Sequence, residues 1–248
     1  MAQARIRLDQ LLVERGHFPS RARAQGAIEA GLVTIGGRAI VKPSHPVAPH
    51  TDVIVLGDVH DYVSRGGVKL AAALDAFSLD AAQRVCLDLG ASTGGFTEVL
   101  LRRGASRVYA VDVGRDQLHP AIAADPRVQN LEGVHAKDIS RTMVPEPIGL
   151  LVADVSFISL RKVLPPVLDL LAREAALVVL VKPQFEIGRE NIGKGGIVKN
   201  AAAGVRVAED IASWLRGEYR FQPKGVIKSP IKGGDGNTEF LIGATRTA

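Results

Sequence analysis

The sequence predicts an α/β fold in two parts, a small α+β module followed by a larger domain built on a mostly parallel sheet. The chain has 248 residues, which corresponds to about 1.7 domains at roughly 150 residues each. Hydrophobic residues make up 46% and charged residues 23% of it, a balance typical of a globular protein. After a stretch of short elements, apolar strand-like runs alternate with helical segments. We therefore expect the two parts to span residues 1–60 and 61–248.

The first part is predicted to contain two short helices followed by short strands. Leu8, Leu11 and Leu12 have the i, i+3, i+4 spacing of one apolar helical face. Ser20 is a favourable N-cap for the second helix, and a pair of adjacent glycines favours a tight turn between two strands. The predicted elements are helices over about residues 8–16 and 20–31, a hairpin over 32–41 and a strand over 52–56.

The second part alternates continuous apolar segments with helical stretches. Segments that are apolar throughout are typical of strands in a parallel sheet covered on both faces. The last two segments have no clear helix between them and are predicted to close the sheet as a hairpin. The predicted strands cover residues 84–89, 107–112, 149–154, 176–181, 223–229 and 238–244.

Composition excludes several classes of protein. No apolar run approaches the roughly 20 residues of a membrane-spanning helix, and the charged N-terminus does not fit a secretory signal. We therefore expect a cytoplasmic protein without a membrane partner. The single cysteine, Cys86, excludes an intramolecular disulfide and a cysteine-built zinc site. No bound metal and no disulfide-linked partner are expected.

The basic residues of the first part gather around its predicted helices and hairpin. A net charge of +5 favours a polyanionic partner, although on charge count alone a solvated basic face explains these residues better. The Arg-Leu-Asp start, the Ser-Arg-Ala-Arg-Ala helix and the Gly-Leu-Val-Thr-Ile-Gly-Gly hairpin together resemble the S4 RNA-binding module. The resemblance implies phosphate contacts from Arg7, Arg21, Arg23 and Lys42.

A glycine-rich loop, Asp-Leu-Gly-Ala-Ser-Thr-Gly-Gly-Phe-Thr over residues 88–97, follows the first strand of the second part. Its spacing fits neither the G-x-G-x-x-G pattern of a dinucleotide site nor a phosphate-binding loop that ends in G-K-[ST]. It resembles the S-adenosylmethionine loop of class I methyltransferases, which implies a Rossmann-like domain with that cofactor. The implied cofactor contacts are Asp88, Gly90, Ser92, Gly94, Gly95 and Phe96.

Two further acids are candidates for cofactor binding. Asp112 ends the second strand about 24 residues after Asp88, a distance at which a carboxylate takes the ribose hydroxyls of a bound nucleoside. Asp138 is expected to end the third strand, and by the family resemblance it faces the adenine amino group. For both residues, an ordinary strand-end or capping role is the alternative.

Four charged residues that are far apart in sequence are candidates for catalysis. Asp154 and Lys182 each end an apolar strand, Glu239 begins the last strand, and Lys69 lies beside an element end. Three of the four are therefore expected at one edge of the sheet. A lysine at the end of an apolar strand is costly to bury as a charge, so it is either paired with a carboxylate or neutral. A purely structural ion pair is the alternative.

This quartet and its flanking residues resemble the Lys-Asp-Lys-Glu tetrad of FtsJ-type RNA ribose 2′-O-methyltransferases. With the S4-like module in front, the chain resembles the TlyA family, which is named for haemolysin but comprises ribosomal RNA methyltransferases that act on cytidine ribose. The resemblance implies that Lys182 is the base, made neutral by burial and by the neighbouring cation Lys69. Asp154 and Glu239 would orient the lysines, and Asp154 would also lie nearest the methyl donor.

The implied partner is ribosomal RNA or a ribosomal subunit. Because short family members resemble enzymes restricted to the large subunit, we expect large-subunit RNA as the substrate, with the small subunit as the alternative. Arg65, Arg189 and Lys194 are further candidates for RNA contacts. The last two belong to a glycine-rich segment over residues 186–199, which is either a mobile loop beside the site or a solvated loop.

Phe157 and Phe185 stand next to the proposed catalytic residues in the sequence. Aromatic side chains stack on bases that are flipped out of an RNA structure. One of these rings is therefore a candidate for stacking on the target cytidine, and membership of the core is an equal alternative.

Three rival functions fit parts of the sequence. A membrane-active haemolysin requires a spanning or strongly amphipathic segment, which the sequence does not offer. A non-catalytic RNA-binding protein has no need of the charged quartet and the glycine loop together. A methyltransferase that acts on a base, a protein or a small molecule is the third, but base amino methylation is expected to use an Asn/Asp-Pro-Pro-Tyr/Phe motif. The corresponding residues from Asp154 are Asp-Val-Ser-Phe.

Overall fold

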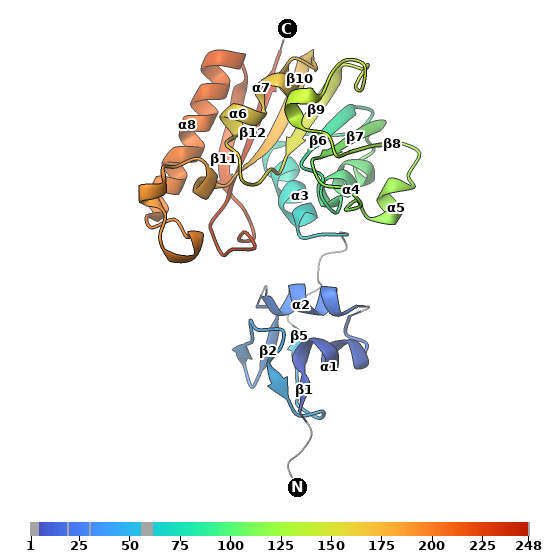
Figure 1. Cartoon of the computed structure of the whole chain (residues 1–248), viewed down its shortest axis with the longest axis vertical. Helices are drawn as coiled ribbons and strands as arrows, with labels where there is room; N and C mark the ends of the chain where they lie inside the picture. Colours follow the sequence, from blue (N-terminus) through green and yellow to red (C-terminus); the bar gives the residue numbers. More distant parts are fainter. Residues whose placement is uncertain (1–4, 19, 30, 56–61, 248) are drawn as a thin grey trace. The chain divides into compact units, whose positions relative to one another are not determined.

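The computed structural model of the chain describes residues 5–18, 20–29, 31–55 and 62–247. The chain divides into two compact units, Met1–Asp61 and Tyr62–Ala248 (Figure 1). Among the described residues, the first unit has one cluster of buried hydrophobic side chains and the second has two. The expected boundary between residues 60 and 61 falls outside the described residues.

The first unit packs α1 and α2 against short strands. In its described part the elements are β1 (Ile6–Arg7), α1 (Leu8–Glu14), α2 (Arg21–Glu29), β2 (Val33–Ile35), β3 (Arg38–Ala39), β4 (Pro46–Val47) and β5 (Ile54–Val55). Leu8, Leu12 and Ile28 are fully buried in its core. The predicted hairpin is the antiparallel β2–β3 pair, and β5 pairs with the other edge of β2. The β1–β4 pair was not predicted, because it joins two short segments that are far apart in the sequence, Ile6 with Val47 and Arg7 with Pro46.

The second unit alternates strands with helices along most of its length. Its described helices are α3 (Gly66–Phe77), α4 (Gly95–Arg102), α5 (Pro120–Ala123), α6 (Leu160–Val163), α7 (Pro165–Leu168) and α8 (Ala201–Tyr219), with short 3₁₀ helices η1 (Ala136–Asp138), η2 (Pro183–Phe185), η3 (Arg189–Asn191) and η4 (Lys194–Gly196). Its described strands are β6 (Val85–Leu89), β7 (Arg107–Asp112), β8 (Val128–Glu132), β9 (Ile148–Ala153), β10 (Leu171–Val181), β11 (Gln222–Lys228) and β12 (Phe240–Arg246).

These strands form one mixed sheet in the order β11-β12-β10-β9-β6-β7-β8. The pairs from β10 to β8 are parallel, whereas β12 runs antiparallel to both β10 and β11. Every predicted strand forms, and the predicted closing hairpin is the β11–β12 pair. Strand β8 was not predicted, because its sequence Val-Gln-Asn-Leu-Glu mixes apolar and polar residues, as an exposed sheet edge permits.

Helices cover both faces of the sheet, which confirms the α/β class (Figure 1). One core cluster joins the sheet to α3 and α4, and the other joins it to α6, α7 and α8. Alternate residues of β6 enter opposite clusters, with Cys86 in the first and Leu87 in the second. Because β6, β7, β9 and β10 are parallel, their carboxyl ends lie along one edge of the sheet. Open parallel sheets bind their ligands at this edge.

Candidate active site

The glycine loop after β6 is pressed against the residue that follows β9. Gly90 has a φ of +85°, and a Cβ at this position would lie 2.4 Å from the carbonyl oxygen of Asp154. Both the backbone conformation and the lack of space therefore require glycine here. The close approach brings the loop and Asp154 together at the carboxyl edge of the sheet.

A cavity of about 500 Å³ opens beside this loop, and Gly90, Ser92, Asp112 and Asp154 are among its lining residues. Asp112 ends β7 as predicted. One of its carboxylate oxygens accepts a hydrogen bond from the Ser92 amide at 2.8 Å, and the other accepts one from the Gly114 amide at 2.8 Å. Backbone donors thus fix the orientation of a carboxylate at the wall of the cavity.

Two of the residues predicted to contact the cofactor, Asp88 and Gly94, do not line the cavity. Asp88 is fully buried, and one carboxylate oxygen accepts a hydrogen bond from the Thr97 hydroxyl at 2.7 Å. Its other oxygen has no partner among the described residues. Burial raises the pKa of Asp88 to about 7. Gly94 adopts a φ of +98° just before α4. Both residues therefore shape the loop rather than the wall of the cavity.

The prediction that Asp138 ends the third strand is wrong. Strand β8 ends at Glu132, because the backbone turns at Gly133 with a φ of +74°. Asp138 lies in η1, its side chain is exposed, and it is not among the residues that line the cavity. The strand-end acid is Glu132, whose carboxylate accepts hydrogen bonds from the amides of Gln117 and Leu118 at 2.6 and 3.0 Å. Sequence reasoning missed this residue because it missed β8.

Lys69 and Glu239 form a buried ion pair between α3 and the start of β12. Lys69 Nζ lies 2.6 Å from Glu239 Oε2, and the two side chains are 9% and 3% exposed. Burial raises the pKa of Glu239, while the Lys69 ammonium acts in the opposite direction. This pair brings a residue from the helix layer to the carboxyl edge of the sheet.

Lys182 and Asp154 form the second ion pair of the predicted quartet. Lys182 Nζ lies 2.7 Å from Asp154 Oδ1 and donates a hydrogen bond to the Ser156 hydroxyl at 2.7 Å. Each lysine is therefore paired with one of the two carboxylates of the quartet. The Ser156 contact was not predicted, although the residue belongs to the Asp-Val-Ser-Phe segment already singled out.

The sheet register explains why the two pairs lie close together. Val181 of β10 pairs with Phe240 of β12, which places Lys182 and Glu239 at neighbouring strand ends. The charges of Asp154 and Lys182 both act on the pKa of Glu239. The structure thus brings the whole predicted quartet together.

Two further cavities adjoin the first at these charged residues. One has a volume of about 450 Å³, and Ser156, Lys182 and Glu239 are among the residues that line it. The other, of about 190 Å³, is lined in part by Asp154 and Lys182 and also by the predicted cofactor residues Gly95 and Phe96. The Lys182–Asp154 pair therefore lies where the three cavities meet.

Phe157 lies beside the junction of these cavities, with an exposed side chain. It is 90% exposed, has a φ of +65° and lines both larger cavities. Its ring lies 5.1 Å from that of Phe185, centroid to centroid, at an angle of 49°. Membership of the core is therefore excluded for Phe157.

The basic residues predicted to contact RNA in the second unit do not line the 450 Å³ cavity themselves, but residues near them do. A Cβ on Gly234, which lines this cavity, would lie 3.5 Å from Arg65 Nη2. Arg189 and Lys194 are exposed on η3 and η4, and Gly196 at the end of η4 lines the cavity.

Asn237 ties this loop segment to the residues that precede β12. Its side-chain oxygen accepts a hydrogen bond from the Val198 amide at 3.0 Å, and its side-chain nitrogen donates one to the Gly196 carbonyl at 3.0 Å. Asn237 is only 2% exposed. This role could not be predicted from local patterns, because it depends on two segments that meet only in the folded chain.

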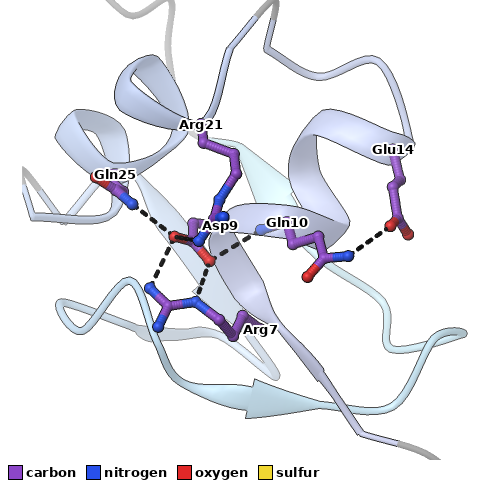
Figure 2. Close-up of polar contacts among 6 residues, drawn as sticks. All are labelled: Arg7, Asp9, Gln10, Glu14, Arg21 and Gln25. Carbon is purple, nitrogen blue, oxygen red and sulfur yellow. Dashed lines mark hydrogen bonds and ion pairs between the residues drawn. The ribbon is translucent and has the colours of Figure 1, made fainter.

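In the first unit, the predicted phosphate contacts lie on or near its helices and strands. Arg7 ends β1, Arg21 and Arg23 lie in the first turn of α2, and Lys42 follows β3 with an exposed side chain. Arg7 and Arg21 both contact the buried carboxylate of Asp9 (Figure 2).

Comparisons with known proteins find relatives of both units. Residues 62–246 match the family described as FtsJ-like methyltransferase, and residues 6–54 match the S4 domain. The chain is 44% identical, over 96% of its length, to the 16S/23S rRNA (cytidine-2′-O)-methyltransferase TlyA of Mycobacterium tuberculosis, and it covers 89% of that protein. It is 35% identical, over 73% of its length, to the 23S rRNA (cytidine-2′-O)-methyltransferase TlyA of Campylobacter jejuni, with 69% of that protein covered.

The fold is also found among solved structures. A Streptococcus thermophilus protein that carries the name hemolysin superposes with a TM-score of 0.76 and 39% sequence identity, over 99% of this chain and 90% of that one. In the part of the chain that the structure describes, no helix combines the length and the apolar character needed to cross a membrane.

Proposed function

The chain belongs to the FtsJ-like methyltransferases that carry an S4 domain, the TlyA family, and from this premise we propose that it methylates the ribose 2′-oxygen of a cytidine in ribosomal RNA. The observation that carries the proposal is the Lys182–Asp154 ion pair at the junction of the three cavities. The relatives named as rRNA (cytidine-2′-O)-methyltransferases support cytidine ribose as the target.

The family and the fold imply S-adenosylmethionine as the methyl donor, and the 500 Å³ cavity fits it. Asp112, held by two backbone amides, offers a fixed carboxylate to vicinal ribose hydroxyls. The backbone at Gly90 and Ser92 is open to a ligand, and Asp154 stands between this cavity and Lys182. These residues would hold the cofactor, which when bound supplies an electrophilic methyl group. Asp88 and Gly94 would contribute by shaping the loop.

Lys182 is proposed to handle the proton of the target hydroxyl. Its Nζ donates a hydrogen bond to the Ser156 hydroxyl at 2.7 Å. A ribose hydroxyl that enters the 450 Å³ cavity could contact the same Lys182 amino group. A ribose hydroxyl is a poor nucleophile near neutral pH, and accepting its proton or stabilising its oxyanion promotes methylation. Asp154 would stabilise the Lys182 ammonium, and the Lys69–Glu239 pair would keep both lysines in place.

The surroundings of the 450 Å³ cavity suit an RNA substrate. The exposed ring of Phe157 offers a stacking surface for a base beside Lys182. Arg65, Arg189 and Lys194 would contact phosphates around it. We propose a ribosomal subunit as the natural partner, with the S4 domain providing further phosphate contacts, and large-subunit RNA as the first substrate to test.

The experiment that tests this function measures methyl transfer from labelled S-adenosylmethionine to isolated 30S and 50S subunits. Lys182→Ala should lower the transfer rate by at least about a hundredfold, because the group at the target hydroxyl is removed. The matched control is Lys228→Ala, since Lys228 is an exposed lysine on β11 that lines none of the three cavities. Titration calorimetry with S-adenosylmethionine should give nearly equal affinities for both variants. Wild-type turnover by Lys182→Ala would overturn the proposed role.

A further inference from the structure

Asp9 lies at the centre of a polar cluster in the first unit (Figure 2). Its carboxylate is completely buried, at 0% exposure. Arg7 donates to it from Nε and Nη2, both at 2.9 Å, and Arg21 donates from Nη2 at 3.2 Å. Gln25 donates from its side chain at 2.7 Å, and the Gln10 amide donates at 3.0 Å. One acid thus links β1, α1 and α2.

Arg7 and Arg21 each contact the buried carboxylate of Asp9 and also reach solvent. Their side chains remain 46% and 54% exposed for Arg7 and Arg21, although both touch a carboxylate that has no exposed surface. A guanidinium carries more N–H donors than Asp9 takes from either arginine. The cluster therefore presents donors to solvent while its inner side is fixed, a geometry suited to a phosphate group.

The carboxylate also offsets repulsion between the two cations. Hydrogen bonding from Arg7 holds the pKa of Asp9 well below its usual range, so the acid is ionised wherever RNA binds. With one negative charge between two positive ones, the cluster keeps a net positive charge. Because Asp9 already orders both arginine side chains, binding an anion costs less side-chain conformational entropy.

We propose that Asp9 is a positioning residue for RNA binding, because it holds Arg7 and Arg21 as a preformed two-arginine site for an RNA phosphate. Asp9 itself does not contact the RNA. The inference rests on the proposed function, since it takes ribosomal RNA as the ligand. It assigns a favourable role in RNA binding to an acid whose negative charge alone would weaken the affinity for RNA.

Charge counting and positioning make opposite predictions for Asp9→Asn. Removal of a negative charge raises the net charge of the chain and by itself strengthens binding to RNA. Loss of the carboxylate releases both arginines and by itself weakens binding. Glu14→Gln is the matched control: Glu14 lies on the same helix, is exposed, and accepts a hydrogen bond from Gln10 at 3.0 Å (Figure 2). It removes the same charge at a site remote from the arginine contacts.

The test uses the full chain, a labelled 23S rRNA transcript as the probe, and filter binding over a range of KCl concentrations. We expect Asp9→Asn to weaken binding about tenfold and Glu14→Gln to leave it unchanged or slightly tighter. In a chain that already carries Arg7→Ala and Arg21→Ala, Asp9→Asn should have no further effect. Equal affinities for Asp9→Asn and Glu14→Gln would overturn the proposal. An equal loss of affinity from Asp9→Asn in the chain that carries Arg7→Ala and Arg21→Ala would also overturn it, because that result indicates a purely structural role for Asp9.

Arg7→Lys keeps the proposal testable if Asp9→Asn fails to fold by circular dichroism. This variant retains the charge but lacks the paired donors that contact Asp9, so it should bind the transcript several times more weakly than the wild type. Wild-type affinity in Arg7→Lys would contradict the proposal. A wild-type chain that neither binds nor methylates rRNA would overturn the proposed function itself, and the inference with it. A wild type that does both, with variants that bind normally, would overturn the inference alone.

Discussion

Replacement of Asp88 by asparagine should change how the stability of the second unit depends on pH. The carboxyl group is fully buried, it keeps the Thr97 hydrogen bond at 2.7 Å, and its pKa is raised from 3.8 to about 7. A shift of this size means that the folded protein binds the proton up to about 4 kcal/mol more tightly than the unfolded chain. Because the folded pKa is the higher one, this stabilisation is present in acid and is lost as the pH rises through 7. Asparagine can still accept the Thr97 hydrogen bond but does not titrate.

The wild type should therefore lose stability relative to Asp88→Asn by about 3 kcal/mol between pH 5 and pH 8. Urea unfolding followed by tryptophan fluorescence measures this, because Trp214 is the single tryptophan of the chain and lies on α8 in the second unit. Asp80→Asn, at an exposed position in the same unit, is the control and should show little pH-dependent difference from the wild type. A difference between Asp88→Asn and the wild type that stays constant with pH, or reverses, would refute the reasoning.

Other variants test the remaining parts of the site. Phe157→Ala should change the stability by less than about 0.5 kcal/mol, because the ring is 90% exposed, yet it should reduce kcat/KM for RNA about tenfold if the ring stacks on the target base; an unchanged kcat/KM would argue against stacking. Glu239→Gln leaves Lys69 buried without its carboxylate and should destabilise the second unit by about 3 kcal/mol in the same urea assay; a wild-type unfolding midpoint would mean that the pair is not held as described. Gly90→Ala should weaken S-adenosylmethionine binding at least tenfold in calorimetry, because its methyl group would lie 2.4 Å from the Asp154 carbonyl oxygen; unchanged affinity would show that the loop does not need this close approach.

The parts of the fold that could be predicted are those where one physical demand dominates the sequence. Strands β6, β7, β9 and the second half of β10 are buried on both faces, so they are largely apolar and recognisable in isolation. Strand β8 lies at the sheet edge and carries polar residues, and β1 and β4 have two residues each. Their pairing depends on neighbours that are distant in sequence, and local patterns do not record it.

The same distinction applies to the candidate site. Asp154 and Lys182 could be placed at one edge because each ends an apolar strand of a parallel sheet. The partner of each lysine could not be derived, because it depends on β12 lying beside β10 and on α3 reaching the same edge. Asp138 was misplaced because the preceding strand went unrecognised and its end could not be located.

The central claim is that this site methylates the ribose of a cytidine in ribosomal RNA. The most direct test incubates the protein and S-adenosylmethionine with 50S and 30S subunits from cells that lack the enzyme, then analyses the digested RNA by mass spectrometry. We predict 2′-O-methylcytidine in 23S rRNA, formed by the wild type and Lys228→Ala but not by Lys182→Ala. A methyl group on a base, or no transfer to either subunit from protein that binds S-adenosylmethionine, would contradict the account.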